Sequence, residues 1–169
     1  SVSKALSVLC GSAASKNGGT IVLMDNPTPD EGSYALTRGI MSRYSYNNLL
    51  TFTGKDPYDG TIYPARLDYE NFGLSGPTKF EYLPFYPSRT SLFINTCGYP
   101  LIIGEEVYAT RFSLLFHDGI GEIKKGTVNS TDTTIDGGTV DSIHVGGGYA
   151  TDTSYGVLGD CSLRINGGT

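Results

Sequence analysis

Few residues in this chain combine the type and the spacing that catalysis needs. His117 and Asp118 could pair a base with a carboxylate, but neighbouring residues of a strand face opposite ways, which favours a polar strand end. Cys97 is expected in a tight turn with no His nearby in the sequence, which favours a structural role over a reactive thiol. His144 is expected to face solvent, and no Gly-x-Ser-x-Gly motif is present. We therefore predict that the chain is not an enzyme.

Acidic residues in expected loops could act as paired carboxylates or hold a cation. Glu105-Glu106 and the acids Asp56, Asp59, Asp68 and Glu70 could serve glycoside cleavage, although turn and strand-edge roles also account for them. The segments Asp56 to Gly60 and Asp25 to Glu31 could bind calcium through loop oxygens. Neither has the alternating acids of a dedicated calcium loop, so we expect no metal and no cofactor.

Aromatic residues lie in or beside turns that contain proline, where a loop tip would expose them. Tyr is a frequent contact residue because it offers a rigid amphipathic surface at a low cost in entropy. The candidate contact residues are Tyr58, Tyr63, Tyr82, Phe85, Tyr86 and Tyr99. These side chains could stack on a sugar ring or on a protein partner, or they could pack within turns and core.

Charge and hydropathy argue against several partners. The formal net charge is −5, and the 12 basic residues are scattered apart from Lys124-Lys125, so we do not expect nucleic acid as a partner. No segment approaches the roughly twenty apolar residues that span a bilayer, so no membrane insertion is expected. The three cysteines lack the spacing of a zinc or redox motif. One disulfide with a free thiol, or three free thiols, would both fit.

The elements that would position these residues fall into two parts of different composition. All eight prolines and most aromatic residues lie at or before Pro100, and no Pro or Phe occurs after Gly126. We therefore expect a globular β-sandwich domain in residues 1–120 and tandem β repeats in residues 121–169.

The first part consists of short runs rich in Val, Ile, Thr, Tyr and Phe, separated by turn residues. The expected strands are Thr20 to Met24, Tyr34 to Tyr46, Leu49 to Thr53, Thr61 to Tyr69, Lys79 to Leu83, Thr90 to Thr96 and Leu101 to Phe116. Seven or eight strands at this spacing predict an all-β fold, an antiparallel β-sandwich or jelly roll. Val2 to Cys10 fits a helix and an edge strand equally well.

The last forty residues contain two copies of a segment of about twenty residues. Residues 130–135 align with 150–155, and residues 142–149 align with 162–169. Each copy offers two strands, in which Ile143 or Leu163 would face inward while His144 or Arg164 faces out. This period predicts a short repeat-built β coil. Two or three coils bury too little surface to stand alone, so they must contact the globular part, another chain or further coils.

These repeats resemble the short Gly/Thr-rich passenger repeats of bacterial autotransporter adhesins, and also the coils of phage tail fibres. The matching positions are Asp136 to Thr139, Val145 to Gly148 and Ile165 to Thr169, whereas Val157-Leu158 departs from the pattern. The resemblance covers about a quarter of the chain and implies a place in a surface or virion structure.

Together these features predict a non-enzymatic structural and attachment module of a larger assembly, such as a virion, a tail fibre or a cell-surface adhesin. The expected location is the virion or the extracellular surface. The expected partners are further copies of the chain or other structural subunits, with a glycan receptor as a further candidate. Two alternatives stay open: a carbohydrate-binding lectin or glycoside-acting enzyme, and a viral capsid or decoration protein.

Overall fold

The structure is a computed structural model that describes residues 2–10, 18–25, 46–67, 71–86, 92–109, 114–117, 127–128, 130–144, 156–157 and 159–169. It contains one helix and twelve strands within these residues. The helix α1 spans Val2–Cys10, and the strands are β1 Gly19–Val22, β2 Leu50–Thr53, β3 Asn71–Gly73, β4 Thr78–Glu81, β5 Leu92–Asn95, β6 Leu101–Ile103, β7 Leu114–His117, β8 Thr127–Val128, β9 Thr131–Ile135, β10 Ser142–His144, β11 Gly156–Val157 and β12 Cys161–Ile165.

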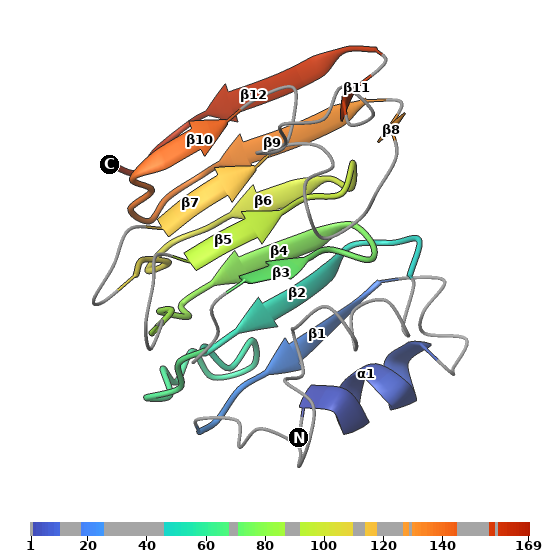
Figure 1. The fold of residues 1–169 in the computed structure, drawn as a ribbon. Coiled ribbons are helices and arrows are strands. Elements are labelled where there is room, and N and C mark those ends of the chain that lie inside the picture. Colours follow the sequence, from blue (N-terminus) through green and yellow to red (C-terminus); the bar gives the residue numbers. More distant parts are fainter. Residues whose placement is uncertain are drawn as a thin grey trace.

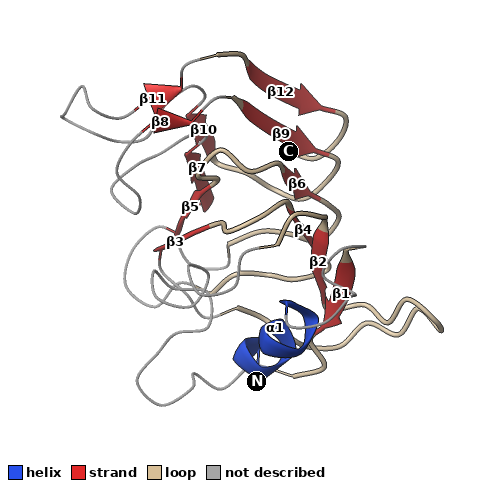
Figure 2. Cartoon of the chain, turned by 90° about the vertical axis from the view of Figure 1, so that its right-hand side faces the viewer, coloured by secondary structure: helices blue, strands red, loops and turns tan. Residues whose placement is uncertain are grey.

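The strands stack as successive coils of a parallel β solenoid (Figures 1 and 2). Six of them form one sheet, here called the long sheet, in the order β1-β2-β4-β6-β9-β12. Four more form the second sheet, in the order β10-β7-β5-β3, and β8 pairs with β11. From β2 onward, a strand of the second sheet lies in sequence between successive strands of the long sheet. From β2 to β10, each coil therefore contributes one strand to the long sheet and one strand to the second sheet.

The predicted antiparallel sandwich or jelly roll is wrong, because the strands of all three sheets pair in parallel. An antiparallel bridge occurs at Lys55 and Ile62, within the loop after β2. Each wall of a solenoid has one buried face, so its strands alternate inward and outward as half-buried antiparallel strands do. Alternation therefore carries no information about strand direction, and neither do the number and spacing of the strands, from which the sandwich was predicted.

The core consists of side chains stacked in register along the long sheet, in two columns. The apolar ladder contains Ile21, Phe52, Phe80, Ile103 and Ile135 in the core, and it ends on the edge strand β12 with Ile165, which is 67% exposed. The mixed ladder contains Leu50, Thr78, Leu101, Thr133 and Leu163. Phe52 and Phe80 stack with ring centroids 5.5 Å apart, and both are fully buried. The side chains stacked on neighbouring coils thus form one continuous core.

The coils are unequal in length, although the ladders stay in register. Phe80 and its partner Ile103 are 23 positions apart in the sequence, whereas Ile103 and its partner Ile135 are 32 positions apart. The additional residues of the longer coils lie between the strands of the long sheet. A fixed sequence period is therefore absent from most of the chain.

The last two coils follow a longer period than the predicted one of about twenty residues. Thr131 pairs with Cys161 and Ile135 with Ile165, thirty positions further on. The segment Ile135 to Thr139 then stacks on Ile165 to Thr169, so that each glycine pair lies on its counterpart. The alignment with 150–155 pointed to the wrong partner, and residues 151–155 lie outside the described residues. Leu163 faces inward as predicted and packs against the core.

The sheet also crosses the boundary expected near residue 120. Strand β6 from the first part pairs directly with β9 from the second, so both belong to the same sheet. The expected strand Leu101 to Phe116 is two strands, β6 and β7, with a turn at Glu105-Glu106 between them. Within Thr61 to Tyr69 the described residues hold bridges at Ile62 and Leu67 but no strand, and Tyr34 to Ser45 lies outside the described residues.

The helix α1 packs at the β1 end of the stack, opposite β12 (Figures 1 and 2). Leu6 is fully buried, and Ala5, Leu9 and Cys10 pack against the core. Of the two structures that fitted Val2–Cys10, the helix is the one observed. With nine residues it is too short to cross a membrane, and the described residues contain no helix that could do so.

Candidate binding site

Three neighbouring strands of the long sheet bring their carboxyl ends to one corner of the stack. Lys55 and Asp56 follow β2, Tyr82 follows β4, and Glu105 comes shortly after β6. In parallel strands these ends meet at the same edge of the sheet. We call the resulting cluster the Tyr corner; its residues are Lys55, Asp56, Tyr58, Tyr63, Tyr82 and Glu105.

Backbone hydrogen bonds hold the Tyr corner across three coils. The amide of Gly54 donates to the carbonyl of Tyr82 (3.1 Å), and the amide of Tyr82 donates to the carbonyl of Glu105 (2.7 Å). The amide of Tyr63 donates to the carbonyl of Gly54 (2.7 Å). A Cβ at Gly54 would lie only 2.3 Å from the Tyr82 carbonyl oxygen, so glycine is required for this close approach.

The side chains of the corner are linked through Tyr82. The Lys55 Nζ donates to the Tyr82 hydroxyl at 3.2 Å and lies 4.4 Å from the centroid of the same ring. The Tyr82 hydroxyl in turn donates to the Glu105 carboxylate. An ammonium, a phenol and a carboxylate from three coils therefore form one chain of charge-assisted contacts.

Tyr82 has a left-handed backbone, with φ at +48°. For a residue with a Cβ this conformation costs about 1–2 kcal/mol. Gly138 and Gly168 adopt positive φ at the corners that follow β9 and β12, where no such cost arises. Cys97 and Glu106 have the same left-handed backbone, with φ at +52° and +54°, so this strain recurs at turns of the stack and is not particular to Tyr82.

The loop from Lys55 to Ile62 displays Tyr58 at its tip, and that side chain is 97% exposed. Two carboxylates of the loop stabilise it through hydrogen bonds. Asp56 accepts from the Tyr58 amide and Asp59 accepts from the Thr61 amide, both at 2.8 Å. The Asp56 amide also donates to the carbonyl of Thr61. Hydrogen bonds from Thr61 hold the pKa of Asp59 below its ordinary value. The loop is thus ordered without help from a partner.

Tyr63 completes the corner as a hydrogen-bond donor. Its hydroxyl donates to the second carboxylate oxygen of Asp56 at 3.4 Å. Partial desolvation, together with the negative charge of Asp56, raises the pKa of Tyr63. A phenol is protonated at neutral pH in any case, so Tyr63 can donate this hydrogen bond to the Asp56 carboxylate.

The six contact residues predicted from the sequence do not form one surface. Tyr58, Tyr63 and Tyr82 belong to the Tyr corner. Tyr86 lies apart from them and packs under the guanidinium of Arg66, 4.4 Å from its ring centroid. Phe85 follows the other alternative, packing in the core: it is fully buried, edge-on to Phe80. Tyr99 packs against the core at the turn after β5.

Lys55 was not foreseen, and Glu105 was foreseen only as half of a carboxylate pair. Both depend on which coil stacks on which, and the unequal coil lengths hide that from the sequence. The acids Asp56 and Asp59 serve the turn, while Asp68, Glu70 and Asp118 lie outside the described residues, as do the side chains of His117 and His144. The described part of the chain contains no group of three His, Cys, Asp or Glu arranged to hold a metal ion.

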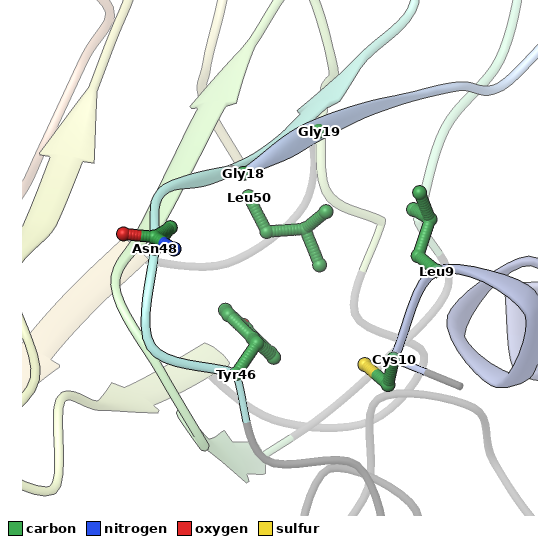
Figure 3. Close-up of a pocket in the computed structure, with 7 residues that line it drawn as sticks. All are labelled: Leu9, Cys10, Gly18, Gly19, Tyr46, Asn48 and Leu50. Carbon is green, nitrogen blue, oxygen red and sulfur yellow. The ribbon is translucent and has the colours of Figure 1, made fainter. Parts of the chain in front are cut away.

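The three cysteines are free thiols. Cys97 is buried in the turn after β5, where its amide donates to the Asn95 side chain at 2.9 Å. Cys10 lines a very small pocket of about 10 Å³ between α1 and the start of the long sheet, with Leu9, Tyr46 and Leu50 among its neighbours (Figure 3). Burial raises the pKa of the Cys10 thiol, which disfavours the reactive thiolate. The pocket lies where the helix packs on the stack, and its lining is mainly apolar.

A scan against protein-family models, a search of curated proteins and a search of solved structures each found no match to this chain. The function must therefore be argued from the site itself.

Proposed function

We propose that this protein is a non-enzymatic attachment module of a larger assembly, such as a virion, a tail fibre or a cell-surface adhesin. In this proposal the parallel stack is a rigid arm, and the Tyr corner is the surface that contacts a receptor. The exposed Tyr58, held at the tip of a hydrogen-bonded loop, is the observation that carries it.

Two physical arguments support this role. An aromatic side chain that is 97% exposed adds nothing to the core and is fully available to contact a partner. Because this loop is already ordered, it loses less conformational entropy when a partner binds. Tyr58 and the strained Tyr82 lie on the same corner, which makes the corner the natural contact surface.

The test is attachment of the fluorescently labelled chain to a panel of bacterial and animal cells, measured by flow cytometry. We expect saturable binding to at least one cell type, and a fall of about tenfold or more for Tyr58→Ser, because losing an aromatic anchor is worth at least 1.4 kcal/mol. Tyr108→Ser is the matched control, because Tyr108 is also exposed but lies outside the corner. Absence of saturable binding to every cell type, or equal loss for both variants, would refute the proposed function.

A further inference from the structure

We propose that the Tyr corner binds a neutral glycan chain that lies along the axis of the stack, across the coils that contain β2, β4 and β6. This inference rests on the proposed function and names the class of receptor that the corner fits. It draws on three observations: the spacing of the corner's groups, their chemistry and their charge.

The spacing favours a long, repetitive ligand. Lys55, Tyr82 and Glu105 come from three successive coils of one parallel sheet. Neighbouring strands lie about 4.8 Å apart, so the three groups extend over roughly 10 Å along the axis. One sugar ring would cover only part of this length, whereas two or three linked rings would span it.

The chemistry combines aromatic rings with fixed hydrogen-bonding groups. Tyr58 and Tyr82 offer rings on which the C–H face of a sugar can pack. The Glu105 and Asp56 carboxylates can accept from sugar hydroxyls, and the Lys55 ammonium can donate to them. Both carboxylates are already oriented by phenols, Glu105 by Tyr82 and Asp56 by Tyr63. Fixed polar groups around an aromatic surface are typical of sites that orient a polar ligand.

The charge favours a neutral glycan over an acidic one. The segments that form the corner, 55–59, 79–82 and 104–106, contain two lysines and five carboxylates. Lys79 is already paired with Glu81 at 2.6 Å, and Lys55 contacts Tyr82. A sialylated, sulfated or uronic-acid chain would therefore meet an excess of negative charge, which disfavours its binding.

The test uses a glycan array that carries both neutral and acidic glycans, followed by titration calorimetry with oligosaccharides of one to six units from the strongest neutral hit. We expect neutral glycans to bind and acidic ones not to bind. We expect the affinity to rise about tenfold or more from one to three sugar units and then to level off, because the groups extend over only roughly 10 Å.

Two variants separate this site from a structural effect. Tyr82→Gly removes the ring from a backbone position that suits glycine, and Glu105→Gln removes the charge with little change of shape. Each should weaken glycan binding about tenfold or more, while Tyr108→Ser leaves it unchanged. Circular dichroism and thermal unfolding of the same samples would confirm that the variants are folded.

The outcomes distinguish this inference from the proposed function. Attachment to cells without binding to any neutral glycan would leave the attachment role in place and overturn the glycan, pointing instead to a protein receptor that uses Tyr58 and the exposed Ile62. Binding that is confined to acidic glycans, that ignores chain length or that survives Tyr82→Gly would also overturn the inference. A chain that attaches to no cell and to no glycan would overturn both.

Discussion

Thr133 places a hydroxyl inside the stack without an acceptor among the residues that the structure describes. The side chain is fully buried in the mixed ladder, between Leu101 and Leu163, and within the described part of the chain its Oγ1 has no hydrogen-bond partner. A buried hydroxyl left unpaired costs about 1–3 kcal/mol, because it has lost its bonds to water. Val has nearly the same shape and no such cost. Thr133→Val should therefore raise the free energy of unfolding by about 2 kcal/mol, or the melting temperature by roughly 4–8 °C.

Thr78 is the matched control, because it lies two coils earlier in the same ladder and is also fully buried. Its hydroxyl donates to the Gly76 carbonyl at 2.9 Å and shares a hydrogen bond of 2.6 Å with the Tyr46 hydroxyl. Thr78→Val leaves the buried phenol of Tyr46 without this partner. The same chemical change should here lower the free energy of unfolding by about 1–3 kcal/mol.

The assay is urea unfolding of the chain and both variants, followed by far-ultraviolet circular dichroism and by tyrosine fluorescence. Opposite signs for the two substitutions support the assignment of an unpaired hydroxyl at Thr133. A loss of stability in Thr133→Val comparable to that in Thr78→Val would falsify the argument, because it would mean that the Thr133 hydroxyl has a partner such as a buried water.

Three further predictions concern the helix α1, the Tyr corner and the buried phenol of Tyr46. Leu6→Ala removes a fully buried side chain from α1 and should cost about 2–5 kcal/mol in thermal or urea unfolding, whereas exposed Val8→Ala should cost less than about 1 kcal/mol. Gly54→Ala should lower the melting temperature more than Gly60→Ala, because the new Cβ at Gly54 meets a carbonyl oxygen at 2.3 Å, whereas at Gly60 it meets only a flexible lysine carbon at 3.9 Å and the cost is that of a left-handed backbone (φ +77°), about 1–2 kcal/mol; equal shifts would count against the close approach. Burial raises the pKa of Tyr46 above its ordinary value of about 10, so its contribution to stability is present below pH 10 and is lost as the pH rises further. Unfolding measured between pH 8 and 11.5 should show this loss, and Tyr46→Phe should flatten it.

Local strand positions could be predicted from the sequence where a short apolar run had turn residues on both sides. Leu49 to Thr53 and Thr90 to Thr96 contain β2 and β5, and the inward position of Leu163 follows from alternation along β12. Alternation reports which side chains are buried, and burial is the same whether the neighbouring strand runs parallel or antiparallel. The direction of pairing, and with it the fold, could not be obtained this way.

The candidate site could be predicted only in part, for the same reason. Tyr58, Tyr63 and Tyr82 were recognisable as loop aromatics, but nothing in the local sequence distinguishes them from Phe85, which follows Pro84 in a similar context and is fully buried. The contact between Lys55 and Tyr82 links residues 27 positions apart. It depends on the stacking of β2 on β4, which unequal coils conceal. The glycine pairs at 137–138 and 167–168 were visible, yet a third pair at 146–147 offered a competing alignment.

The unequal coil lengths show that strand register does not depend on the length of the segments that connect the strands. Register is set by the side chains of the ladders, which stay aligned whether 23 or 32 positions intervene. Buried side chains such as Leu67, Phe85 and Val107 lie between the strands of the long sheet and belong to the core, so length and sequence can change without disturbing the scaffold only in exposed loop segments such as 57–62. In evolutionary terms, a stack built in this way can change the surface of one corner by insertion or recombination of a single exposed loop. The same property makes the loop between Lys55 and Ile62 a place where a foreign recognition sequence can be grafted.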